Sequence, residues 1–119
     1  MSETPFVCQA KQWALVNRIA AASAHQLDVN VREVLGRGRS ASVAAARQVA
    51  MAALMRVSNL SSDAIGCAFG RDRSTVLHAV KRCGQDEALQ ELVGIVLYKT
   101  GFVFSGQSYT EISTGPTSE

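Results

Sequence analysis

Apolar residues recur at helical spacing along most of the chain. The stretch from Val7 to Gln26 has no proline or glycine, and its apolar residues fall on one stripe. We expect this stripe to be buried; it comprises Trp13, Leu15, Val16, Ile19 and Ala20. A longer pattern, from about Ser42 to Val57, is apolar on more than one side and predicts a central helix. A further helix is predicted from Asp86 to Lys99, packed against the first.

Polar features interrupt this pattern at two places. Arg47 and Gln48 lie near the beginning of the central helix, where we expect them to stay exposed while the later turns are covered. Asn30 can cap a short turn that spans Val31 to Leu35. Residues 36–40 follow, with the sequence Gly-Arg-Gly-Arg-Ser, and are called the basic loop below. The two glycines let its backbone approach a ligand closely.

The stretch from Ser61 to Arg82 predicts a helix-turn-helix. Ser61 can cap a helix of about two turns, Gly70 makes the turn, and Asp72 caps a second helix. Gly66 allows the two helices to approach closely. In such a motif the first turn of the second helix meets base edges in a major groove. The first exposed residues there are Arg73, Ser74 and Thr75. An ordinary pair of packed helices is the alternative at this point.

Length and composition indicate one packed domain. The chain has 119 residues, of which 47% are hydrophobic and 18% charged. We expect an all-α fold with a flexible N-terminus at 1–6, one helical domain at 7–100 and a mostly disordered, serine- and threonine-rich tail at 101–119. Within the tail, the apolar triplet 102–104 is expected to dock on the domain, and a partner-binding motif is the alternative.

The lack of a membrane span or signal segment, together with the cysteine content, predicts a cytoplasmic protein. No apolar run reaches the roughly 18 residues of a membrane span, and the first residues lack the segments of a secretory signal. We therefore expect no membrane partner. The widely spaced Cys8, Cys67 and Cys83 do not form a disulfide or zinc pattern, and we expect them to act as small packing residues in a reducing compartment.

Charge is distributed unevenly along the chain. Residues 30–83 contain nine basic and three acidic side chains, a net of +6, whereas the whole chain carries +2 and the remainder therefore −4. A basic middle between acidic flanks is the electrostatic outline of a polyanion-binding surface, and arginine suits phosphate and base recognition better than lysine. A solvated arginine face on a helical domain would show the same asymmetry.

The sequence predicts no catalytic, metal or cofactor site. His78 has no nucleophile or carboxylate partner in sequence, and we expect it to pack or cap within its helix. Asp72 could act as a general base, but its position as a helix cap accounts for the residue without a catalytic role. The basic loop lacks the lysine and the spacing of a GxxxxGK phosphate loop, so no nucleotide is expected. We expect a protein that is not an enzyme.

Six pieces of the middle region occur together in a recognisable order. They are VREVL at 31–35, RGRS at 37–40, SV at 42–43, RQVAM at 47–51, IGCAFGRD at 65–72 and STVLHA at 74–79. With them, about 52 of the 119 residues resemble the C-terminal DNA-binding domain of the bacterial chromosomal replication initiator DnaA. A generic helix-turn-helix would explain only the last two pieces. The initiator's ATPase module has no counterpart here, so the resemblance implies a free-standing binder of double-stranded DNA, associated with the nucleoid.

The resemblance, together with the predicted motif, implies a role for each basic or polar residue of this region. The residues expected to contact bases are Arg39 in the minor groove and Asp72, Arg73, Ser74 and Thr75 in the major groove. The residues expected to contact the DNA backbone are Arg37, Arg47, Gln48, Arg71, Lys81 and Arg82.

This chain departs from the family pattern in the recognition turn and at two further positions. This chain has Gly70 where the family usually has two glycines, Arg73 in place of a histidine and Ser74 in place of a threonine. Two positions that are often arginine are Ala41 and Ala45. Arginine prefers the O6 and N7 acceptors of guanine to a thymine methyl group, which argues against recognition of the usual initiator box. Fewer basic positions should also flatten the salt dependence of binding.

Two functions follow from these patterns. The first is sequence-selective binding of double-stranded DNA that regulates replication initiation or transcription. The second is an adaptor that keeps the fold but binds a replication or recombination factor, through the helix around Leu89 to Leu97 or through the triplet 102–104.

Overall fold

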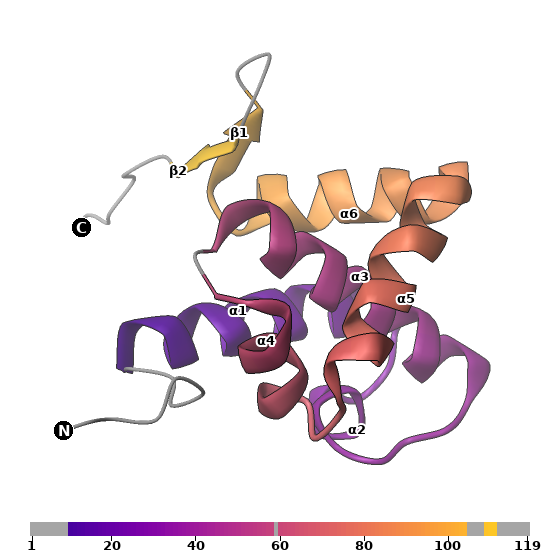
Figure 1. Ribbon diagram of the computed structural model, residues 1–119. Coiled ribbons are helices and arrows are strands. Elements are labelled where there is room, and N and C mark those ends of the chain that lie inside the picture. The colour runs from indigo at the N-terminus through magenta and orange to yellow at the C-terminus, as the bar shows by residue number, and fades with distance from the viewer. Residues whose placement is uncertain (1–9, 59, 105–108, 112–119) are drawn as a thin grey trace, which may run out of the picture.

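The computed structural model describes residues 10–58, 60–104 and 109–111, and helices dominate this part of the chain (Figure 1). The helices are α1 (Ala10–Gln26), α2 (Val31–Leu35), α3 (Ala41–Val57), α4 (Ser62–Ala68), α5 (Arg73–Gln85) and α6 (Glu87–Lys99). The expected all-α class, with a helix-turn-helix formed by α4 and α5 between flanking helices, is confirmed. None of the helices described is long and apolar enough to cross a membrane.

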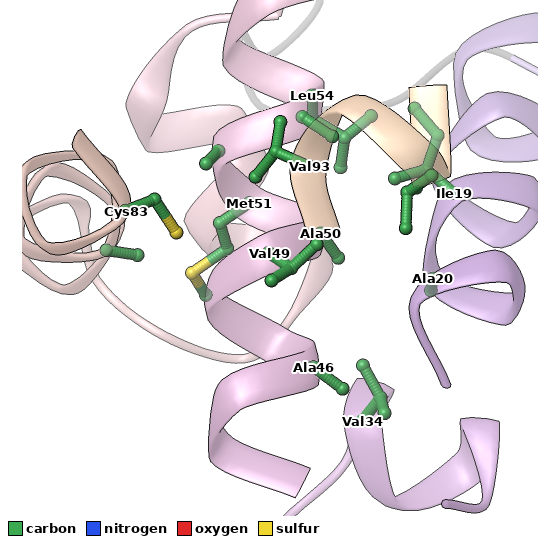
Figure 2. Packing of buried hydrophobic residues seen from close by; sticks show 14 of the residues in the cluster. Ile19, Ala20, Val34, Ala46, Val49, Ala50, Met51, Leu54, Cys83 and Val93 are labelled. Atoms are coloured by element: carbon green, nitrogen blue, oxygen red, sulfur yellow. The ribbon is translucent and has the colours of Figure 1, made fainter. Parts of the chain in front are cut away.

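Helix α3 lies at the centre of the fold, as its all-round apolar pattern predicts. It packs against α1, α5 and α6 and also contacts α2 and α4. Its buried residues are Val43, Ala46, Arg47, Val49, Ala50, Met51, Ala52, Ala53 and Leu54. Figure 2 shows Cys83 of α5 beside Met51 on one side of α3 and Ile19 of α1 on the other. The many alanines of α3 allow neighbouring helices to approach it from several directions, because a small side chain keeps the helix surface close to its axis.

Side-chain caps fix where the helices begin. The cap side chains of Asn30, Ser61 and Asp72 accept hydrogen bonds from backbone N–H groups in the first turns of α2, α4 and α5, which confirms the predicted caps. Ser40, the last residue of the basic loop, caps α3 by accepting from the Val43 N–H at 3.1 Å. Asp86 ends α5 and caps α6 in the same way. These local bonds satisfy backbone donors that have no partner within the helix.

The first and last long helices pack together, as expected, and Arg18 reinforces the contact by donating to the Thr100 carbonyl at 2.6 Å. Trp13, however, is 43% exposed, so its expected place in the core is wrong. Leu15 is partly buried against the core, and the fully buried positions of the α1 stripe begin at Val16.

The cysteines were expected to be packing residues, and this is confirmed for one of the two that the structure describes. Cys83 is buried against α3, whereas Cys67 is exposed on α4, so the packing role expected for Cys67 is wrong. In α4 the buried positions are Ala64, Ile65 and Gly66, and the next residue along a helix points about 100° away from Gly66. Cys8 lies outside the described residues.

A short antiparallel hairpin follows α6, within the segment expected to be mostly disordered. Strand β1 (Phe102–Phe104) pairs with β2 (Tyr109–Glu111), with Phe102 opposite Glu111. Phe102 is 5% exposed and belongs to the core, so the expected docking is confirmed for this residue. Residues 105–108 and 112–119 lie outside the described part of the chain. The hairpin and the basic loop lie at opposite ends of the molecule (Figure 1).

Candidate nucleic-acid interface

Two glycines shape the turn between α4 and α5. Gly70 has a φ of +68°, a left-handed conformation that residues with a Cβ rarely adopt. Gly66 lies under the turn, where a Cβ atom would be 2.7 Å from the Arg71 carbonyl oxygen and 2.9 Å from that of Asp72. The Arg71 N–H donates to the Gly66 carbonyl at 2.7 Å and closes the turn. Both expected roles, the close approach at Gly66 and the turn at Gly70, are confirmed.

The carboxylate of Asp72 organises the first turn of α5. Its Oδ1 accepts from the Ser74 hydroxyl at 2.8 Å, the Thr75 hydroxyl at 3.0 Å and the Thr75 backbone N–H at 3.1 Å. The hydrogen bond from Ser74, followed by those from Thr75, lowers the pKa of Asp72 below its ordinary value of 3.8. Because both hydroxyl protons point at Asp72, Ser74 and Thr75 present their oxygen lone pairs and methyl or methylene groups to a ligand.

Helix α5 has one buried face and one exposed face. The buried residues are Val76, Ala79 and Cys83. The exposed residues that repeat on the other side are Arg73, Ser74, Leu77, His78, Lys81 and Arg82. They follow one another at intervals of one and three residues, so they form a continuous surface along the helix. This surface is called the α5 face below.

Sequence reasoning missed two members of the α5 face. Leu77 is 47% exposed, which makes it one of the large apolar side chains on the described surface. His78 is also exposed, so the expectation that it packs or caps within the helix is wrong. Both residues follow Arg73 and Ser74 by four positions, and this spacing was the signal that could have placed them on the same face.

Arg47 does not lie where it was expected. It is 7% exposed, and its guanidinium donates to four backbone carbonyls. The acceptors are Val34 at 2.9 Å, Glu33 at 2.8 Å, Gly36 at 3.2 Å and Gly38 at 3.0 Å. Burial, and secondarily the charge of Arg71, lowers the pKa of Arg47, although an arginine side chain keeps its proton in proteins. Its expected exposure is therefore wrong, and the side chain supports α2 and the basic loop from inside. The contact with the DNA backbone expected of Arg47 stays a prediction.

The basic loop and the turn meet around a hollow in the surface. Arg37 and Arg39 of the loop are exposed, while Arg71 of the turn is half-buried and donates to the Gly36 carbonyl at 3.3 Å. The hollow has a volume of about 240 Å³ and is lined by Arg37, Arg39, Gly70 and Arg71. The predicted site residues Arg37 and Arg39 thus line one depression together with Arg71, which follows them by more than 30 positions in the sequence.

Gln48 lies apart from this hollow. Its side chain is half-buried on α3, and its backbone carbonyl accepts a hydrogen bond from the Cys83 thiol at 3.6 Å. This contact ties α3 to the C-terminal part of α5. The structure therefore places Arg37, Arg39 and Arg71 at the hollow and Arg73, Ser74, Lys81 and Arg82 on the α5 face. Asp72 and Thr75 lie at the start of α5, and Arg47 and Gln48 do not line the hollow. Among the residues described, no three His, Cys, Asp or Glu side chains come together in a way that could hold a metal ion.

The fold and this surface define a helix-turn-helix domain with a basic binding surface. Residues 16–83 match the family model described as bacterial dnaA protein helix-turn-helix. The chain therefore belongs to this family, a family of DNA-binding domains. Over 64 residues it is 41% identical to the chromosomal replication initiator protein DnaA of Mycobacteroides abscessus. The matched region is 54% of this chain and 13% of that relative, so the similarity covers a small part of the larger protein.

Proposed function

We propose that this domain binds double-stranded DNA with sequence selectivity, with the α5 face in the major groove. The observation that carries the proposal is the α5 face itself: a capped helix presents an arginine and a serine at its start, with the half-buried Thr75 beside them, and two basic residues further along. The first turn of a recognition helix is the part that reaches base edges. The basic loop, at the same end of the molecule as this turn, would follow the adjacent minor groove with Arg39.

Different residues of the surface would serve different purposes. Arg73 would read a base, because its guanidinium makes no side-chain hydrogen bond or ion pair within the described part of the chain and can pair with guanine O6 and N7. Lys81 and Arg82 would contact phosphates along the same groove. Ser74 and Thr75 would accept hydrogen bonds from base amino groups, since Asp72 holds their protons. Arg47 would hold the basic loop in place through its hydrogen bonds to the Gly36 and Gly38 carbonyls.

The biological role we propose is regulatory. The relative from Mycobacteroides abscessus is named a replication initiator, and the family matched here is one of helix-turn-helix DNA-binding domains, which supports an action through occupation of DNA sites. We propose that the protein occupies sites at origins or promoters in the nucleoid and thereby modulates replication initiation or transcription.

The test compares two arginines of the α5 face on a set of duplexes. Fluorescence anisotropy would measure the affinity of the wild type, Arg73→Ala and Arg82→Ala for an initiator-box duplex, its single-base-pair variants and a scrambled duplex, each across a salt series. We expect Arg73→Ala to cost about 1–3 kcal/mol of binding free energy and to relax the preference at one base pair. We expect Arg82→Ala to weaken all duplexes alike and to reduce the salt slope by about 1.

Two outcomes would contradict the proposal. Equal effects of the two substitutions on every duplex would refute the division between base and backbone contacts. Failure of the wild type to bind any duplex at low salt would refute DNA binding by this chain.

A further inference from the structure

The hollow between the basic loop and the turn concentrates positive charge without a balancing carboxylate. Its walls are Arg37, Arg39, Gly70 and Arg71, and no acidic residue lines it. Within the described residues, none of these three arginines forms an ion pair. The carboxylate of Asp72, next to Arg71 in the sequence, accepts hydrogen bonds from Ser74 and Thr75 at the start of α5. Glu33 lies beside Gly38 of the basic loop but does not line the hollow.

A fourth guanidinium lies behind the loop. Arg47 supports the loop from inside, and the charge of Arg71 contributes to the lowered pKa of Arg47, so the two guanidiniums repel each other. Like charges gathered at short range without a counter-ion destabilise one another, and a bound anion relieves this repulsion. The guanidinium is also the side chain best suited to bind a phosphate through two parallel hydrogen bonds.

The walls of the hollow are held in place before any ligand arrives. Arg71 donates to the Gly36 carbonyl at 3.3 Å and to the Gly70 carbonyl at 3.5 Å, which spans loop and turn. Arg47 holds Gly36 and Gly38, on either side of Arg37, by their carbonyls. Gly70 has no side chain, and a Cβ built there would meet no atom within 4 Å, so this wall stays open to the outside. A preorganised site binds its ligand without first having to order its own groups.

We propose that this hollow binds a single phosphate group of the DNA backbone, at the point where the strand passes from the basic loop to α5. The inference rests on the proposed DNA binding and adds to it one shared phosphate that Arg37 and Arg71 contact together. Arg39 lines the same hollow, so the bound phosphate lies beside the minor groove that Arg39 enters. The hollow thereby sets the register between the loop and the α5 face on the duplex.

The test replaces each backbone phosphate of the bound duplex, one at a time, by a neutral methylphosphonate. Affinities are measured for the wild type, Arg71→Ala, Arg37→Ala and, as the matched control from the α5 face, Arg82→Ala. We expect one methylphosphonate to weaken the wild type by about ten-fold. The same methylphosphonate should cause almost no further loss in Arg71→Ala or Arg37→Ala, but the full loss in Arg82→Ala. Arg37→Ala guards against a folding effect of Arg71→Ala, because Arg37 is exposed and donates no hydrogen bond within the described residues.

The outcomes distinguish failure of the shared phosphate site from failure of the proposed DNA binding. If the duplex binds but no single phosphate couples to both Arg37 and Arg71, the shared site is refuted while DNA binding stands. If the wild type binds no duplex at low salt, DNA binding itself is refuted and with it the DNA source of the phosphate. A titration with inorganic phosphate, followed by the NMR signals of the Gly70 and Arg71 amides, distinguishes the sources. Saturable shifts without duplex binding would identify free phosphate as the ligand and overturn the proposal.

Discussion

The basic loop and the α5 face are both rich in arginine, but they acquire their shapes in different ways. The α5 face follows from a local cap at Asp72 and from helical periodicity, so neighbours in sequence specify it. The basic loop depends on Arg47, which is 9 to 14 positions away from the carbonyls it binds. The comparison teaches that not every arginine of a basic region is available to a ligand, because burial turns Arg47 into a support for the fold while the loop arginines stay exposed.

The largest expected effect comes from removing the support of the loop. Arg47→Ala should lower the free energy of unfolding by about 3 kcal/mol, because four buried or partly buried hydrogen bonds to backbone carbonyls lose their charged donor. Urea unfolding followed by circular dichroism measures this. Arg37→Ala is the control, since an exposed loop arginine should change stability by no more than about 0.5 kcal/mol. Similar stabilities of the two variants would abolish the distinction between support and contact.

The next effect tests the turn that joins the two regions. Gly66→Ala should destabilise the domain by about 1–3 kcal/mol, because the new Cβ would lie 2.7 Å from the Arg71 carbonyl oxygen, a rigid backbone atom. Gly94→Ala in α6 is the matched control, because a Cβ there meets nothing within 4 Å. Alanine should stabilise that helix interior by about 0.5–1 kcal/mol. Thermal unfolding of both variants checks the prediction, which fails if the two substitutions shift the midpoint in the same direction.

A smaller effect concerns the apolar member of the α5 face. If Leu77 contacts a thymine methyl group, replacing that thymine by uracil should cost about 0.8 kcal/mol of binding free energy. Leu77→Ala should then bind the thymine and uracil duplexes equally. Tyr98→Ala is the control, because Tyr98 is 73% exposed on α6, away from the α5 face, and should leave the discrimination intact. Uniform tolerance of uracil by the wild type would exclude this contact.

The smallest effect is the pH dependence of the cap. The pKa of Asp72 is lower in the folded protein than its ordinary value of 3.8, so the cap stabilises the fold fully above that value. This stabilisation is lost as the pH falls through the folded pKa. Urea unfolding between pH 5 and pH 3, at about half-unit steps, should show the wild type losing more stability than Asp72→Asn, whose amide oxygen still caps the helix but does not titrate. Parallel losses in both proteins would show that the acid sensitivity arises elsewhere.

More of the secondary structure than of the candidate site could be predicted from the sequence. The caps at Asn30, Ser61 and Asp72 and the glycine turn at Gly70 follow from short-range rules and were predicted correctly. Trp13 was placed in the core because it shares a spacing with Val16, yet periodicity does not show where a covering helix ends. The roles of the residues expected to contact DNA stay predictions, although their positions are now known.

By itself, the sequence determined the class of fold, the family resemblance, the helix-turn-helix and the basic character of residues 30–83, because each depends on residues close together in the chain. Only the tertiary structure decided that Arg47 turns inward, that Leu77 and His78 join the α5 face, and that Arg37, Arg39 and Arg71 line one hollow. These outcomes depend on which helices cover which side chains and on which carbonyls lie within reach of a guanidinium. Such contacts join residues that are distant in sequence, and local patterns do not specify them.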